Sequence, residues 1–301
     1  MSLLVVGSVA FDSVETPVDK VEKALGGSAT YCSVAASYFA DDVKMVGVVG
    51  EDFGDKNIAM LKNHNINLDG LEIVKGEKTF SYGCVYRDDM NIRDTLFTDL
   101  NVFEKFDPVI PEEMRAIPYL LLGNITPALQ LKVLDQMKQL KFTVCDTMNL
   151  WIDIARDDLV KVIERVNLLV VNDSEAKMLT NEGNLIKAAK KIMAMGPKYL
   201  IIKKGEHGAM LFGEGKIFSA PAYPLETVFD PTGAGDSFAG GFMGYLTKAD
   251  EINFDVMKKA ILYGSTTASF CVEKFSTNGI ENKSMEEIEE RYNEFITLSQ
   301  V

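Results

Sequence analysis

Short apolar runs alternate with amphipathic stretches along most of the chain. Leu3–Val6, Tyr119–Leu122 and Leu168–Val171 are continuous apolar runs, and their length is typical of strands that are buried on both faces. The stretches 128–140 and 185–195 carry apolar residues at helical spacing. This alternation predicts an α/β fold with a mostly parallel central sheet that helices cover on both faces.

The same pattern predicts the remaining elements. Further strands are expected at 44–49, 142–145 and 199–203, with a hairpin at 209–212 and 216–219. Further helices are expected at 28–40, 55–63, 154–165, 174–179, 255–272 and 285–298. No repeat, low-complexity tract or change of composition marks a linker, so we expect residues 1–301 to form a single domain.

Residues 79–102 follow a period of two instead of a helical period. Large residues at 80, 82, 84 and 86 alternate with smaller or polar ones, which is typical of a strand with two different faces. A polar turn at 88–91 then leads to a return strand at 95–98. We expect a small flap here, and an ordinary edge hairpin explains the pattern equally well. The polar stretch 12–23 is too irregular for a core element.

Composition excludes several classes of function. The chain has 44 acidic and 31 basic residues, which argues against nucleic acid or an anionic membrane as the main partner. Its two histidines leave no histidine-rich metal site and little room for Ser-His catalysis. The four cysteines are far apart, no signal peptide is recognisable, and no apolar run approaches the ~20 residues of a membrane span. We therefore expect a cytoplasmic protein with reduced thiols.

The most informative stretch is 230–241, Asp-Pro-Thr-Gly-Ala-Gly-Asp-Ser-Phe-Ala-Gly-Gly. Gly233, Ala234 and Gly235 lie where a loop becomes a helix, and the free N–H groups of a first helical turn attract anions. Asp236 follows them at once and would repel a bound phosphate. The conflict disappears if Asp236 takes the proton of an attacking hydroxyl while the amides hold the transferring phosphoryl group. The alternative is a first-turn acid that the helix dipole favours.

Two better-known glycine motifs do not fit this stretch. A P-loop needs a lysine that is missing here, and Phe238 stands where the dinucleotide fingerprint has its last glycine. Gly240, Gly241 and Gly244 lie inside the predicted helix, where each costs roughly 1 kcal/mol relative to alanine. Close packing of this helix against another backbone explains them most simply.

Residues 230–236 resemble the signature of the ribokinase-like (PfkB) carbohydrate kinase family, which usually reads Asp-Thr-Thr-Gly-Ala-Gly-Asp. The resemblance implies a ribokinase-like fold and ATP-dependent phosphorylation of a hydroxymethyl group on a sugar or sugar-like acceptor. It also implies a small β-sheet lid formed by parts of 9–24 and 78–101. In relatives such lids pair between subunits, so a homodimer is expected.

The resemblance assigns a nucleotide side to the site. Asn172 and Glu175 match the family's Asn-x-x-Glu, which organises magnesium and phosphate, although an ordinary capped helix start explains them too. Gly205 and Gly208, with Lys203, resemble the loop that borders the ATP phosphates. A glycine-supported turn between strands is the alternative for this loop.

On the acceptor side, Asp12, Gly26 and Gly27 match the family's sugar-binding acid and paired glycines. A carboxylate can accept hydrogen bonds from two hydroxyls, and glycines let the backbone approach a polyol closely. Tyr31 stands where the family usually has an asparagine. It could stack on a ring of the substrate, or it could simply pack between helices.

Four further positions come from the resemblance. Asn101 resembles an asparagine after the flap, and Asn124 stands where relatives often place a sugar-binding glutamate. Residues 146–151 resemble a shortened Asp-x-Asn-x-x-x-x-Trp element of fructokinase-like members. Asp230 and Thr232 match positions that bind a monovalent cation such as potassium in some relatives, and Thr232 is also expected on the nucleotide side.

Two rival functions stay open at this point. A nucleoside kinase keeps the same chemistry with another acceptor, and Tyr31 with Phe80 or Tyr82 could then stack on the base. A nucleotide- or sugar-binding protein without catalysis is the rival from another class, and the presence of Asp236 argues against it.

Overall fold

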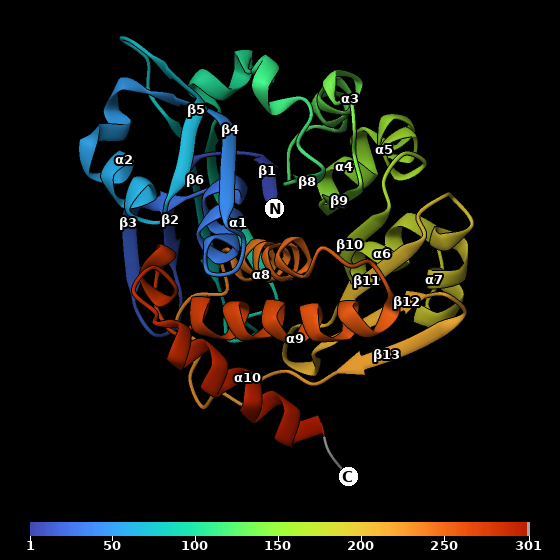
Figure 1. The fold of residues 1–301 in the computed structure, drawn as a ribbon. Coiled ribbons are helices and arrows are strands. Elements are labelled where there is room, and N and C mark those ends of the chain that lie inside the picture. The colour runs from blue at the N-terminus through green and yellow to red at the C-terminus, as the bar shows by residue number, and fades with distance from the viewer. Residues whose placement is uncertain (300–301) are drawn as a thin grey trace.

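The computed structural model describes residues 1–299 and contains a nine-stranded sheet (Figure 1). The strand order is β13-β12-β11-β10-β9-β8-β1-β4-β5, and only β12 runs antiparallel to its neighbours. The strands are β1 (Ser2–Val6), β4 (Asp42–Gly50), β5 (Ile66–Val74), β8 (Tyr119–Leu122), β9 (Phe142–Asp146), β10 (Leu168–Asn172), β11 (Tyr199–Lys203), β12 (Ala209–Gly213) and β13 (Lys216–Ala220). The expected fold class, a mostly parallel sheet of the ribokinase type, is confirmed.

Helices cover both faces of this sheet because each strand buries alternate side chains on opposite sides. Leu3 and Val5 of β1 belong to one core cluster, and Leu4 and Val6 belong to the other. The first face is covered by α1 (Ser28–Ser37), α2 (Gly54–Asn63), α8 (Ala234–Ala249), α9 (Phe254–Cys271) and α10 (Met285–Ser299). The second is covered by α3 (Pro127–Gln136), α4 (Asn149–Ile154), α5 (Arg156–Ile163), α6 (Asp173–Thr180) and α7 (Leu185–Met193).

A separate sheet of four strands lies beside the main one (Figure 1). Its order is β3-β2-β6-β7, with bounds β2 (Ala10–Glu15), β3 (Lys20–Gly26), β6 (Phe80–Tyr86) and β7 (Arg93–Asp99). Residues 12–23 are therefore mostly strand, and they lie outside the main sheet, in the smaller sheet that was expected from parts of 9–24 and 78–101. Their polar character has a physical reason, since alternate residues of β2 are only partly buried. We call these four strands the small sheet.

Two other elements differ from the sequence pattern. The expected helix at 154–165 is two helices, α4 and α5, which meet at Ala155 in a non-helical conformation (φ −135°). Strand β5 was not expected, because it lacks the continuous apolar run that marks the other strands of the main sheet, and most of its side chains are only partly buried. It is the edge strand of the main sheet, where such a composition is tolerated.

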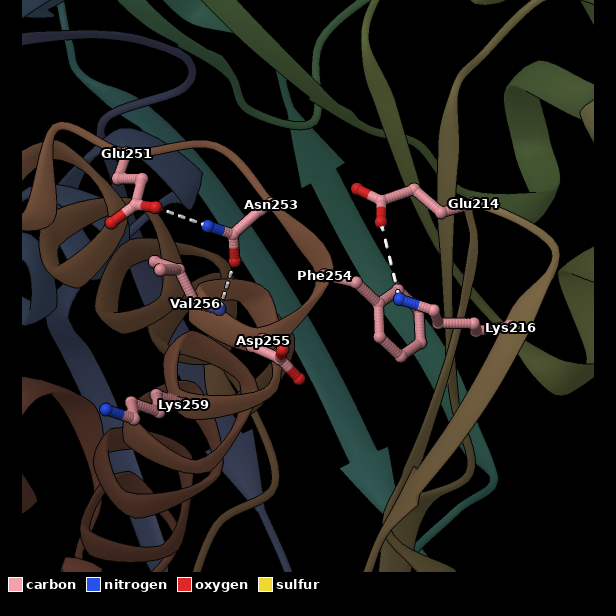
Figure 2. Close-up of a pocket in the computed structure, with 8 residues that line it drawn as sticks. All are labelled: Glu214, Lys216, Glu251, Asn253, Phe254, Asp255, Val256 and Lys259. Atoms are coloured by element: carbon pink, nitrogen blue, oxygen red, sulfur yellow. Dashed lines mark hydrogen bonds and ion pairs between the residues drawn. The ribbon is translucent and has the colours of Figure 1, made fainter.

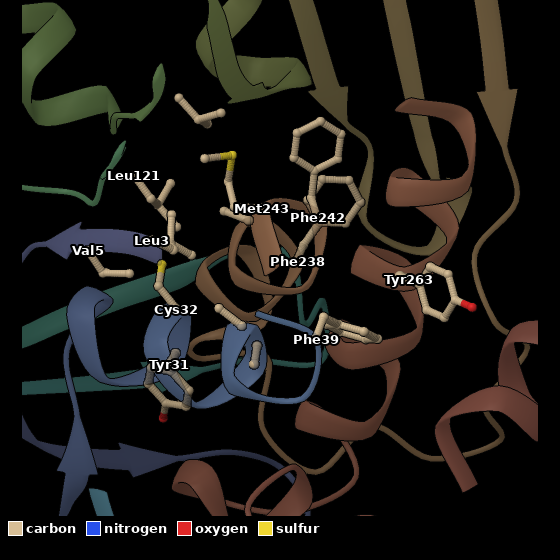
Figure 3. Packing of buried hydrophobic residues seen from close by; sticks show 14 of the residues in the cluster. Leu3, Val5, Tyr31, Cys32, Phe39, Leu121, Phe238, Phe242, Met243 and Tyr263 are labelled. Atoms are coloured by element: carbon tan, nitrogen blue, oxygen red, sulfur yellow. The ribbon is translucent and has the colours of Figure 1, made fainter. Parts of the chain in front are cut away.

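Helix α8 packs directly against the backbone of α1 (Figure 3). A Cβ on Gly240 would clash with the carbonyl oxygen of Cys32, and one on Gly244 would lie 2.7 Å from that of Ala36. The glycines therefore allow the close packing that their positions predicted. This contact fixes the helix on which Asp236 sits. No helix within residues 1–299 is long and apolar enough to cross a membrane.

Candidate active site

The carboxyl ends of three parallel neighbours, β9, β10 and β11, bring charged residues to one edge of the sheet. Ligands of open α/β sheets bind at this edge. The ammonium of Lys203, on β11, lies 3.2 Å from a carboxylate oxygen of Asp146, on β9. The pair is largely buried, with side chains 18% and 7% exposed. A Cβ added to Gly235 would lie 2.7 Å from Lys203 Nζ, so the start of α8 meets this pair.

The loop before α8 forms the expected helix start. Gly233 has a left-handed backbone (φ 78°), and a Cβ there would clash with the ring of Tyr31. The Ala234 N–H donates to the carbonyl of Pro231 at 3.2 Å. No backbone carbonyl among the described residues accepts from the amides of Gly233 and Gly235. Of the three amides expected to bind the phosphoryl group, those of Gly233 and Gly235 are free. The third, of Ala234, is hydrogen-bonded within the loop.

Asp236 carries an unsatisfied oxygen at this position. Its Oδ1 is buried and has no hydrogen-bond partner within residues 1–299, and a buried carboxylate oxygen without a partner requires an explanation. Burial and then the neighbouring charge of Asp146 raise the pKa of Asp236 to about 7, while Lys203 and Arg93 oppose that rise. The carboxyl group can therefore exchange a proton near neutral pH.

Asp12 faces the same space from the small sheet. Burial raises its pKa to about 7, and the charges of Asp230 and Asp236 add to the rise, while the Gly27 N–H bond lowers it. Gly26 pairs with Ala10 across the β2–β3 register, two residues along β2 from Asp12, and a Cβ on Gly26 would clash with the Asp12 carboxylate. The paired glycines are thus needed for the position of Asp12.

Tyr31 adopts the packing alternative. The side chain is 1% exposed and lies under Gly233, so neither ring face is open for stacking. Its hydroxyl is buried without a partner. Burial first, and then Asp12, raise the pKa of this hydroxyl far above its usual range.

Asn172 and Glu175 form a capping box at the start of α6. The Asn172 side chain accepts from the Glu175 N–H at 2.8 Å, and Glu175 Oε2 accepts from the Asn172 N–H at 2.7 Å. The capped helix start is therefore real. Burial, followed by the charge of Asp146, raises the pKa of Glu175 to about 7. Glu175 Oε1 is not part of the capping box.

The loop after β11 meets the tip of the small sheet. Gly205 has φ 54°, and a Cβ there would lie 2.5 Å from Oδ1 of Asn91 in the β6–β7 turn. Gly208 has φ 79°, and a Cβ on it would clash with the Ala220 carbonyl. Both glycines are required by the turn itself. The contact also places the β6–β7 turn against the expected nucleotide side.

Arg93 was missed by the sequence analysis. It pairs with Tyr86 across the β6–β7 register, and the Tyr86 hydroxyl lies 3.2 Å from that of Thr232 in the loop before α8. The positive charge of Arg93 lowers the pKa values of Asp12, Glu175 and Asp236. No local signal marks this arginine, because its place depends on the pairing of β7.

The other expected site residues form hydrogen bonds with the surrounding protein. Asp230 accepts from the N–H groups of Thr232 at 2.8 Å and Ser276 at 3.4 Å. Asn101 donates to the Thr79 carbonyl at 2.9 Å. Asn124 accepts from the Trp151 indole N–H at 2.8 Å. The contacts of Asp230 with Ser276, of Asn101 with Thr79 and of Asn124 with Trp151 could not be predicted from residue spacing.

A cavity of about 400 Å³ lies elsewhere on the molecule (Figure 2). It is bounded by the β12–β13 turn and the start of α9. Its lining shares no residue with the cluster around Asp236. Two of the charged side chains at its rim, Lys216 and Glu214, lie 3.8 Å apart. We assign no role to it.

Acids outnumber bases in the cluster, since Asp12, Asp146, Glu175 and Asp236 face only Lys203 and Arg93. A divalent cation would balance this surplus, and magnesium commonly uses one or two carboxylates together with water and substrate phosphates. No group of three or more metal-ligating side chains occurs within residues 1–299.

The comparisons with known proteins agree with this geometry. The model of the pfkB family carbohydrate kinases matches residues 2–283. The cytidine kinase of Thermococcus kodakarensis is 30% identical over 251 residues, which cover 81% of this chain and 88% of that protein. The nucleoside kinase of Methanocaldococcus jannaschii is 26% identical, covering 87% of this chain and 82% of its own. The solved structure of a nucleoside kinase from that archaeon has a TM-score of 0.78 at 23% identity and covers 97% of this chain and 98% of its own. The chain belongs to the pfkB family of carbohydrate kinases and is a phosphotransferase with an alcohol group as acceptor.

Proposed function

We propose that the protein transfers the terminal phosphoryl group of ATP to a hydroxymethyl group of a nucleoside, with Asp236 as general base. The observation that carries the proposal is the unpartnered, buried Oδ1 of Asp236 beside Lys203 and the free amide of Gly235. A proton acceptor and a set of N–H donors at one point are what in-line phosphoryl transfer needs.

Different residues act on the acceptor and on the phosphoryl group of the donor. Asp12 accepts hydrogen bonds from the acceptor's hydroxyls and orients it, and Asp236 takes the proton of the attacking hydroxyl. The amides of Gly233 and Gly235, together with Lys203, stabilise the negative charge of the moving phosphoryl group. Arg93, on β7 of the small sheet, also stabilises the charge of the moving phosphoryl group.

ATP as donor is supported by a solved Escherichia coli structure in complex with ATP and Mg²⁺, which has a TM-score of 0.78 and 20% identity with this chain. We place the nucleotide phosphates beside Lys203 and the 205–208 loop. Glu175, through the oxygen that the capping box leaves free, would hold magnesium through water. When bound, magnesium supplies positive charge that neutralises the phosphates.

The sequence favoured a sugar over a nucleoside as the acceptor, and the proposed nucleoside acceptor reverses that order. The names of two relatives, a cytidine kinase and a nucleoside kinase, support it. Fructokinase-2 of Zea mays, at 25% identity, is one of several sugar kinases among the relatives. The 30% identity of the cytidine kinase and the buried Tyr31 in place of the family's usual asparagine favour the nucleoside.

The acceptor is tested by assaying ADP release from ATP with panels of nucleosides, sugars and polyols. We expect kcat/KM for at least one nucleoside to exceed that for any free sugar by tenfold or more. Heat-inactivated protein and reactions without acceptor provide the background. Faster turnover of ribose or fructose than of every nucleoside would assign the sugar instead. Binding without turnover of any acceptor would support the non-catalytic alternative.

The small sheet also supports a homodimer. Every residue of β7 is exposed, and Leu96 is 60% exposed on this unpaired edge strand. An edge strand presents unpaired N–H and C=O groups that can pair with another chain, and Leu96 adds apolar surface there. We propose that a second copy covers it, and that Leu96→Lys converts the dimer into a monomer in sedimentation experiments. Ile73→Lys, on the edge of the main sheet and 53% exposed, is the matched control. A wild-type protein that sediments as a monomer would contradict the proposal.

A further inference from the structure

The side chain of Asn124 is already occupied by protein contacts. Its Oδ1 accepts from the indole N–H of Trp151 at 2.8 Å, and its Nδ2 points to the sulfur of Met148 at 3.1 Å. One lone pair and one N–H of this amide stay free for a hydroxyl of the acceptor. Asn124 therefore holds the indole of Trp151 in place, and this contact is compatible with the role of substrate ligand that the sequence indicated.

Trp151 is thereby held between the two halves of the site. The backbone carbonyl of Asn124 accepts from the Ser28 hydroxyl at 3.5 Å, and Ser28 directly follows Gly27, which donates to Asp12. On the other side, the Gln130 amide binds the carbonyls of Gly123 at 3.0 Å and Asp146 at 3.1 Å. Asn124 thus lies between the acceptor carboxylate and the Lys203–Asp146 pair.

The other aromatic side chains considered for stacking already have partners within the protein. Tyr31 is buried under Gly233. Phe80 is stacked on Phe103 with ring centroids 5.3 Å apart. The guanidinium of Arg93 lies over the ring of Tyr82 at 5.9 Å. Trp151 is only partly buried, and its single polar atom is satisfied.

We infer that Trp151, oriented by Asn124, is the surface on which the base of a nucleoside acceptor stacks. The inference rests on the proposed function and names the residues that recognise its substrate. Aromatic stacking accepts any base, because every base has a π face. A second polar group is available in the same segment, since the Thr147 hydroxyl is buried without a hydrogen-bond partner in residues 1–299.

The kinetic test separates Trp151 from Asn124. Trp151→Leu is expected to raise KM for the nucleoside about 5- to 100-fold, the range that loss of one stacked base implies, with kcat and KM for ATP nearly unchanged. Asn124→Leu should raise the same KM, because the indole loses its anchor. Asn124→Asp keeps an acceptor for the indole N–H and should restore most of the wild-type value. Ile154→Ala, on the exposed side of the same helix, is the matched control.

A binding test uses the fact that Trp151 is the only tryptophan in the chain. Cytidine and adenosine should quench its fluorescence, ribose should not, and Asn124→Leu should weaken the quenching. Quenching without turnover would support the stacking surface and refute the kinase function. Nucleoside turnover without quenching, and with KM for Trp151→Leu within twofold of wild type, would overturn the stacking surface alone. Neither quenching nor turnover would refute both.

Discussion

Asp236→Asn is expected to lower kcat about 10²–10⁴-fold, the usual contribution of a positioned general base. The amide keeps the size of the carboxylate but cannot take the proton of the acceptor. KM for ATP should stay within about threefold, because the phosphates are held by amides and by Lys203. The measurement is steady-state ADP release with the best acceptor of the screen.

Thr247→Val is the matched control for Asp236→Asn. Thr247 lies on the same helix, and its hydroxyl is likewise buried without a partner among the described residues. Replacing that hydroxyl with a methyl group removes a polar atom but no reacting group, so kcat should not change. If Asp236→Asn retained a third or more of wild-type kcat, the assigned base would be wrong.

The pH profile of the wild-type enzyme provides an independent check on Asp236. Burial raises the pKa of its carboxyl group to about 7, and only the ionised form can accept a proton. The value of kcat/KM should therefore fall about tenfold per pH unit below 7. Asp12 shares a pKa of about 7, so a steeper fall would indicate that both carboxylates must be ionised. A flat profile between pH 5 and 7 would contradict the assignment.

The sequence predicted well the features that depend only on short continuous segments of the chain. The buried strands were found because continuous apolar runs such as 119–122 and 168–171 need no tertiary information. Gly233, Gly235 and Asp236 were found because a loop, a helix start and an acid follow one another directly. The interior glycines of α8 also predicted a real contact, since Gly240 and Gly244 lie against the backbone of α1 and Gly241 lies against Thr267 of α9.

What the sequence missed depends on pairing between distant segments. Arg93 enters the site through its register with Tyr86, and no spacing along the chain records that register. Glu175 Oε2 accepts from the Asn172 N–H in the capping box, so only Oε1 is free for a metal. The amide oxygen of Asn124 accepts from the Trp151 indole N–H. A polar residue at a strand end can bind a ligand or hold its neighbours, and only the three-dimensional partners decide between these roles.

The second large effect is expected at Lys203. Lys203→Met should lower kcat about 10²–10³-fold, the cost of removing one donor to a developing charge. It should also destabilise the fold, because the carboxylate of Asp146 would stay buried without its partner at 3.2 Å. Loss of one partner of a buried pair typically costs about 3–5 kcal/mol. Thermal unfolding measures this part of the effect.

The double variant Asp146→Asn/Lys203→Met separates the two consequences. Without the acid there is no unpaired charge, so the unfolding temperature should return toward the wild-type value. Activity should stay low, since the phosphoryl group still lacks the ammonium that lies beside Gly235. If the double variant regained both stability and turnover, Lys203 would serve only to neutralise Asp146. The phosphoryl charge would then be carried by the amides of α8 and by Arg93.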